Sequence, residues 1–102
     1  IISGGFNVYP KEIEDVINSI EGIKENAVIG VPHKDLGESI LSIIIKEENI
    51  QIDSKKISEI LTKKLAKYKC PKGYIFINSF PRNSLGKILK KKLREEYNNY
   101  FK

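Results

Sequence analysis

Hydrophobic residues in the first part of the chain recur with the spacing of an α-helix. In the stretch PKEIEDVINSIEG they occupy positions i, i+3, i+4 and i+7, which form one face of a helix. These apolar residues are Ile13, Val16, Ile17 and Ile20. Pro10 suits the first helical position and Gly22 suits the C-terminal cap. The pattern predicts an amphipathic helix bounded by these two residues.

Two runs with strand character follow this helix. Residues 24–31 have a mixed pattern that Pro32 is expected to stop, and residues 39–47 are β-branched and apolar. The second run therefore predicts a buried central strand. Because only the loop HKDLGE separates the two strands, we expect them to pair directly.

The second half of the chain predicts a helix, a strand and a further helix. Asp53 and Ser54 can cap the first of these helices, whose apolar stripe is Ile57, Ile60, Leu61 and Leu65. The stretch YIFINSF alternates aromatic and β-branched residues and predicts a third strand. After a loop at 81–86, rich in turn formers, the last helix carries apolar residues four apart: Leu89, Leu93, Tyr97 and Phe101.

This order of elements predicts an α+β fold. We expect a small three-stranded, largely antiparallel sheet flanked by helices, with a short β-hairpin-like segment at the N-terminus. The 102 residues suit one domain, and the chain has 40% hydrophobic and 30% charged residues, an ordinary globular balance. It contains no methionine, even at position 1, and opens on the apolar IIS. We therefore expect residues 1–102 to be one domain cut from a longer protein.

The net charge of +5 comes from 18 basic and 13 acidic residues, and sixteen of the basic residues are lysine. Arginine is the preferred residue for recognising bases, so the excess of lysine over arginine argues against sequence-specific binding of nucleic acid. A small basic nucleic-acid-binding module, using the run KILKKKLR, remains an alternative. The charge also suits a ligand that carries phosphates.

Several classes of site are excluded or disfavoured by composition. Cys70 is alone, so the chain has no internal disulfide and no cysteine metal site, which fits a reducing, cytoplasmic setting. His33 has no partners at metal-ligand spacing and is expected to be structural or exposed. No metal site is predicted. No apolar stretch approaches the roughly 18 residues that a membrane span needs.

Two places could carry chemistry. Gly4 and Gly5 permit positive φ and close approach of another molecule, although a tight turn alone also explains them. Lys87 follows Gly86 in a loop, where its ammonium could stabilise charge on phosphate oxygens. The spacing alone is more simply explained by a solvent-exposed lysine without a function.

Four stretches taken together resemble a known family. They are ISGGFNVYPKEIE, AVIGVPHKDLGE, LAKYKCPKGYIFIN and FPRNSLGKILKKKLR. In order and spacing they are similar to the C-terminal domain of AMP-forming acyl-CoA synthetases, the adenylate-forming superfamily. The resemblance covers nearly the whole chain and is greatest to the malonate–CoA ligase branch.

The resemblance implies a ligase that joins a carboxylic acid to coenzyme A in two steps. The acid first reacts with ATP, bound with Mg²⁺ in a large N-terminal domain, to give an acyl-adenylate and pyrophosphate. The thiol of coenzyme A then displaces AMP. The C-terminal domain acts as a lid that rotates between the steps. By this resemblance the N-terminal domain, the hinge and a ribose-binding arginine precede Ile1, so the isolated chain is expected to be inactive.

The same resemblance assigns roles to individual residues. Lys87 matches the lysine that contacts the carboxylate and the α-phosphate during adenylation. Ser3, Gly4 and Gly5 match the turn that lines the channel for the pantetheine arm, and Lys69 and Lys72 match a segment near the coenzyme A phosphates. The substrate is expected to be malonate or a fatty acid. A peptide-synthetase adenylation unit, which passes its acyl group to a carrier protein, is the related alternative.

Overall fold

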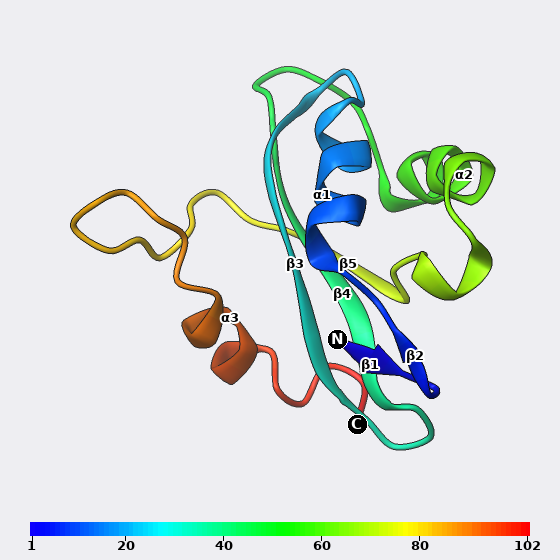
Figure 1. Cartoon of the computed structure of the whole chain (residues 1–102). Helices are drawn as coiled ribbons and strands as arrows, with labels where there is room; N and C mark the ends of the chain where they lie inside the picture. The colour runs from blue at the N-terminus through cyan, green and yellow to red at the C-terminus, as the bar shows by residue number, and fades with distance from the viewer.

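The computed structural model describes all residues, 1–102, as an α+β domain with five strands in one sheet (Figure 1). The elements are β1 (Ile2–Ser3), β2 (Phe6–Asn7), α1 (Pro10–Asn18), β3 (Ile23–His33), β4 (Gly37–Lys46), α2 (Ser54–Lys64), β5 (Gly73–Phe76) and α3 (Lys90–Glu96). The predicted fold class is confirmed, although the sheet is larger than the three strands expected. None of the helices combines the length and the hydropathy needed to cross a membrane.

β3 and β4 pair directly, and β4 is the central strand of the sheet, as predicted. The two strands pair antiparallel from Ile23↔Lys46 to His33↔Gly37, with an irregularity near Ile23. The expectation that Pro32 ends β3 was wrong, because the strand continues to His33. β3 is an edge strand of the sheet. Proline has no N–H, and at an edge it breaks no hydrogen bond between strands when its nitrogen faces away from the neighbouring strand.

The two strands beyond the three expected are β1 and β2, while the predicted third strand, β5, pairs in parallel. The β1–β2 hairpin is not a separate element, because Ser3 pairs with Gly37 and joins it to β4. β5 runs parallel to β4, from Leu41↔Gly73 to Ile44↔Phe76. A parallel partner needs a long crossover connection, and α2 supplies it. The alternation in YIFINSF does not encode strand direction, and so the sequence did not predict this pairing.

Two apolar clusters lie on opposite faces of the sheet. α1 and α2 cover one face and α3 covers the other (Figure 1). Buried members of the first cluster include Ile13, Ile17, Ile44, Ile57 and Leu61. Those of the second include Ile29, Leu41, Ile43, Phe80 and Leu93. Because both faces are covered, β4 is a nearly continuous apolar run rather than an alternating one.

Helix ends follow the sequence signals in part. Pro10 opens α1 and the Asp53 side chain caps α2 by accepting a hydrogen bond from the Lys56 N–H at 2.9 Å. α1 ends at Asn18 with Ser19 as its cap, so the assignment of Gly22 as the cap was wrong. Gly22 has φ +99° in the turn beyond the helix, and a Cβ there would lie 2.5 Å from Ile50. α3 is shorter than predicted, and Phe101 instead bridges to His33.

Candidate functional site

The segment that carries Lys87 folds into a small closed loop between β5 and α3. The N–H of Asn83 donates to the carbonyl of Lys87 at 3.0 Å, and the N–H of Leu89 donates to the carbonyl of Pro81 at 2.9 Å. Arg82 and Ile88 face each other in an isolated antiparallel bridge. We call residues 81–89 the Lys87 loop. Its backbone bonds make it a defined hairpin rather than a loose connection.

The side chain of Asn83 fixes the tip of this loop. Its Oδ1 accepts hydrogen bonds from the N–H of Leu85 at 2.9 Å and of Lys87 at 3.0 Å. Asparagine favours turns because its side chain can replace a backbone acceptor in this way. Gly86 takes φ +84° and lets the chain reverse just before Lys87. The turn formers in the sequence thus hold the backbone of Lys87 in place.

Lys87 presents an unpaired ammonium to solvent. Its side chain is exposed and makes no hydrogen bond or ion pair within the domain. The nearby Leu85 is 92% exposed, so the tip also presents an apolar side chain that nothing in the domain covers. A mobile cation on a braced backbone can contact an anionic group supplied from outside the domain.

The predicted glycine turn forms the tip of the β1–β2 hairpin. Gly4 has φ +57° and Gly5 has φ +87°, and the N–H of Gly4 donates to the carbonyl of Leu36 at 3.0 Å. Ser3 is buried beside the turn. A Cβ on Gly5 would meet no atom within 4 Å. Gly5 is therefore required by its backbone conformation and not by crowding inside the domain.

Lys69 and Lys72 differ in how free their ammonium groups are. Lys69 lies 3.0 Å from a carboxylate oxygen of Glu12, and this hydrogen bond raises the pKa of Lys69 above its usual value. Next to it, Tyr68 stacks on Phe6 with ring centroids 4.6 Å apart. Lys72 is exposed and has no ion-pair partner. Of the two lysines, only Lys72 has an ammonium fully available to a phosphate.

The structure does not bring the two predicted regions together. The Lys87 loop projects from one side of the sheet, while the β1–β2 hairpin with Gly4 and Gly5 lies at the other side (Figure 1). Lys69 joins the hairpin side, because it pairs with Glu12 of α1 and its neighbour Tyr68 stacks on Phe6 of β2. The domain therefore carries two separate regions and not one composite site.

Sequence reasoning missed the charged residues that attach the Lys87 loop to the domain. Arg82 pairs with Glu25 of β3, and its Nη1 donates to the carbonyl of Gly86 at 2.7 Å. Lys90 pairs with Glu14 of α1 at 2.8 Å. The partners are 57 and 76 positions apart in the sequence. No periodic pattern links such distant residues, so only the fold reveals these contacts.

His33 has the structural role expected of an isolated histidine. Its Nδ1 accepts hydrogen bonds from the N–H groups of Asp35 at 3.0 Å and Leu36 at 3.2 Å. Its ring packs against Phe101 with centroids 5.4 Å apart. The histidine thus closes the β3–β4 turn. No group of three or more metal-ligating side chains lies together.

Cys70 is expected to react slowly with alkylating reagents in the folded protein. Its side chain is 9% exposed, and burial raises the pKa of the thiol above its usual value. The reactive thiolate is therefore scarcer than in an unfolded chain at any pH below the raised pKa. Iodoacetamide labelling at ~pH 8, followed by mass spectrometry of the Cys70 peptide, should be slower without denaturant than with it. Equal rates would show that the thiol is freely accessible.

Comparisons with known proteins identify the family to which the chain is similar. The family described as AMP-binding enzyme C-terminal domain matches residues 12–87, a match that ends at Lys87. Long-chain-fatty-acid–CoA ligase FadD13 of Mycobacterium tuberculosis is 48% identical over 97 residues, covering 95% of this chain and 19% of that protein. 2-Succinylbenzoate–CoA ligase of Lactococcus lactis is 45% identical over 94 residues, covering 92% of this chain and 20% of that protein.

The fold is shared with solved structures of the same group. ATP-bound MatB from Rhodopseudomonas palustris superposes with a TM-score of 0.98 at 45% identity, covering 100% of this chain and 20% of that one. The chain thus spans about a fifth of the length of the curated relatives that it matches. Neither a nucleic-acid-binding module nor a peptide-synthetase unit is favoured by these relatives. The chain belongs to the family of AMP-binding enzyme C-terminal domains.

Proposed function

We propose that residues 1–102 are the mobile C-terminal domain of an AMP-forming acid–CoA ligase. The observation that carries this proposal is the unpaired ammonium of Lys87 on a hydrogen-bonded loop, in a chain of this family. Within the domain this cation has no partner, which is the arrangement needed if its partner belongs to another domain. The N-terminal domain of the same polypeptide is the partner that we propose.

Lys87 is proposed to act in the first half-reaction. There a carboxylate oxygen of the acid attacks the α-phosphorus of ATP, and the bond to the pyrophosphate oxygen breaks. Negative charge on the phosphoryl oxygens and the acid is stabilised by a cation placed beside them in a site from which water is excluded. An ammonium on a four-carbon stem suits this role because it acts as a compact, movable charge.

The glycine turn is proposed to act in the second half-reaction. The thiolate of coenzyme A attacks the acyl carbon of the adenylate, and AMP leaves with the electrons of the acyl–phosphate bond. In this proposal Ser3, Gly4 and Gly5 line the path of the pantetheine arm, and Lys69 and Lys72 contact the phosphates. An ammonium has three N–H donors, so Lys69 can do so while it pairs with Glu12. The separation of this turn from the Lys87 loop supports a lid that presents first one region and then the other.

The remaining components lie outside this chain in our proposal. ATP and Mg²⁺ are held by the N-terminal domain, as the resemblance to this family implies. The same domain contains the pocket for the carboxylic acid. Malonate and a long-chain fatty acid are the candidate acids, because the chain is similar to MatB and to FadD13. We also propose that the enzyme is cytoplasmic.

The test of this proposal uses the full-length protein and the isolated domain side by side. Acid-dependent exchange of pyrophosphate into ATP measures adenylation, and mass spectrometry measures acyl-CoA. We expect the full-length protein to perform both with at least one acid from a panel of malonate, fatty acids and 2-succinylbenzoate, and the isolated 102 residues to perform neither. Activity of the isolated domain, or inactivity of the full-length protein with carboxylic acids of every chain length, would contradict the proposal.

A further inference from the structure

Two cations flank Lys87 in the sequence, and each is held by a carboxylate on another element. Arg82, before it, pairs with Glu25 of β3, and Lys90, after it, pairs with Glu14 of α1. We propose that Glu14 and Glu25 are positioning residues that hold the two ends of the Lys87 loop and thereby place its ammonium for adenylation. This inference rests on the proposed function.

The loop has few other attachments to the domain. Phe80 is buried at its start and Ile88 packs against the second apolar cluster, but the tip is exposed. In Figure 1 the loop extends well away from the sheet and its helices. Its internal hydrogen bonds fix its shape but not its direction relative to the domain. The two ion pairs therefore add to the packing of Phe80 and Ile88 in fixing that direction.

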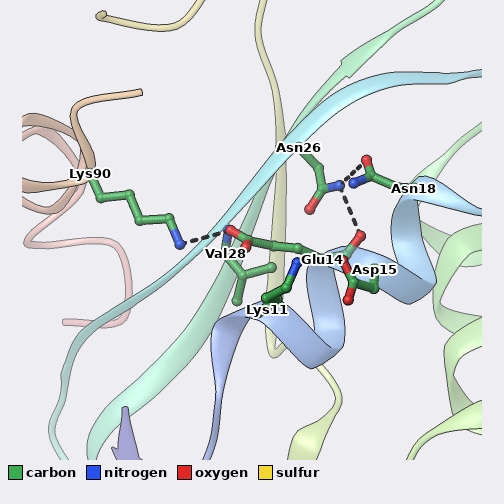
Figure 2. Close-up of polar contacts among 7 residues, drawn as sticks. All are labelled: Lys11, Glu14, Asp15, Asn18, Asn26, Val28 and Lys90. Carbon is green, nitrogen blue, oxygen red and sulfur yellow. Dashed lines mark hydrogen bonds and ion pairs between the residues drawn. The ribbon is translucent and has the colours of Figure 1, made fainter. Parts of the chain in front are cut away.

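Glu14 is placed to connect three elements. Its Oε2 accepts a hydrogen bond from the N–H of Val28 at 2.9 Å and lies 2.8 Å from Nζ of Lys90 (Figure 2). Val28 belongs to the edge strand β3, and its N–H points away from β4. The carboxylate thus accepts the hydrogen bond of a β3 N–H that no neighbouring strand can accept. It also reaches Lys90 at the start of α3, on the other face of the sheet.

The surroundings of Glu14 are themselves held in place. Nδ2 of the buried Asn26 donates to the backbone carbonyl of Glu14 at 3.2 Å and to Oδ1 of Asn18 at 2.6 Å. These bonds tie α1 to β3, so the carboxylate projects from a fixed backbone. The side chains of Glu14 and Lys90 are 19% and 34% exposed. Such shielding makes this pair stronger than a fully exposed one.

Arg82 acts on the other side of Lys87 through two contacts. One guanidinium nitrogen meets Glu25, and the other donates to the carbonyl of Gly86, the residue directly before Lys87. A planar guanidinium can make both contacts in a fixed geometry, which a lysine cannot. Glu25 therefore orients Arg82, and Arg82 orients the peptide that leads into Lys87.

Matched substitutions in the full-length ligase separate positioning from stability. Glu14→Gln keeps an acceptor for Val28 but removes the charge that holds Lys90, while Asp15→Asn removes the same charge from the exposed i,i+4 pair with Lys11. We expect Glu14→Gln to lower acid-dependent pyrophosphate exchange about fivefold, the factor for losing one partly exposed ion pair. Thiolation of a supplied acyl-adenylate should not change, and Asp15→Asn should change neither rate.

The Lys90 side of the same pair offers an independent check. Lys90→Gln should match Glu14→Gln, Lys90→Arg should retain adenylation, and Lys91→Gln on the exposed neighbour should have no effect. The double variant Glu14→Gln/Lys90→Gln should lose no more than either single variant, because both remove one interaction. Glu25→Gln should give a similar, separate loss that adds to that of Glu14→Gln.

The outcomes also distinguish this inference from the function on which it rests. If the unaltered ligase adenylates an acid but Glu14→Gln equals Asp15→Asn, the positioning role is wrong while the function stands. Equal losses in both half-reactions would likewise overturn it, because they would indicate general destabilisation. If the unaltered protein adenylates no acid, both the function and the positioning role fail.

Discussion

Replacing Lys87 with alanine in the full-length protein is expected to slow acyl-adenylate formation by about 10²–10³-fold, the loss typical of removing one donor that stabilises transition-state charge. The ammonium has no contact inside the domain, so its removal breaks no bond that supports the fold. Acid-dependent pyrophosphate exchange measures this step. Thiolation of a supplied acyl-adenylate should remain close to that of the unaltered enzyme, because the proposed role of Lys87 ends with adenylation.

Two further variants make this result specific to the Lys87 charge and its place. Lys87→Arg keeps a cation but changes its shape and reach, so it should recover only part of the rate. Lys91→Ala removes another exposed cation four residues away and should leave both half-reactions unchanged. If Lys87→Ala reduced both half-reactions by the same factor, the assignment of Lys87 to adenylation would be wrong. Acetylation of Lys87, which also removes the charge, should reproduce the alanine result.

Replacing Gly5 with leucine is expected to produce the opposite pattern. A leucine at this tip should obstruct the path of the pantetheine arm and slow thiolation by roughly 10²-fold, the size expected when reacting groups are displaced by about 1 Å. A Cβ at Gly5 meets nothing within 4 Å, so the domain does not crowd the substituted position, and the cost within the domain is the strain at φ +87°. Pyrophosphate exchange should be nearly unchanged, because the Lys87 loop lies at the other side of the sheet (Figure 1).

Gly86 provides the matched control for backbone strain at Gly5. It has φ +84°, close to the +87° of Gly5, and a Cβ there also meets no atom within 4 Å. Gly86→Leu should therefore cause similar strain and a similar change in melting temperature, but it should affect adenylation and spare thiolation. If the two leucine variants affected the same half-reaction, the separation of the domain into two functional regions would be refuted.

The relation between sequence and structure differs between local and distant features. The amphipathic spacing of Ile13 and Ile17 correctly predicted the buried face of α1, because a helix places residues four apart on one side. Asp53 correctly predicted the start of α2, because a cap depends only on the next three residues. The end of β3 was predicted wrongly, because the effect of Pro32 depends on whether its strand lies at an edge.

The candidate site shows the same division. The turn formers around Lys87 and the paired glycines, read with the family resemblance, were enough to single out Lys87, Gly4 and Gly5, since such turns are encoded by adjacent residues. Lys69 was chosen by the same resemblance as a phosphate ligand, but the sequence gives no sign of its pairing with Glu12. That contact depends on how the turn after α2 packs against α1.

The sequence by itself determined the presence of the three helices, the pairing of β3 with β4, the α+β class and the loop that displays Lys87, because each depends on short-range periodicity or turn chemistry. Only the tertiary structure decided that β5 runs parallel to β4, that the two predicted regions lie apart, and that Glu14 and Glu25 pair with the cations flanking Lys87. Strand direction and long-range ion pairs depend on how distant segments pack together. No local pattern of residues specifies that packing.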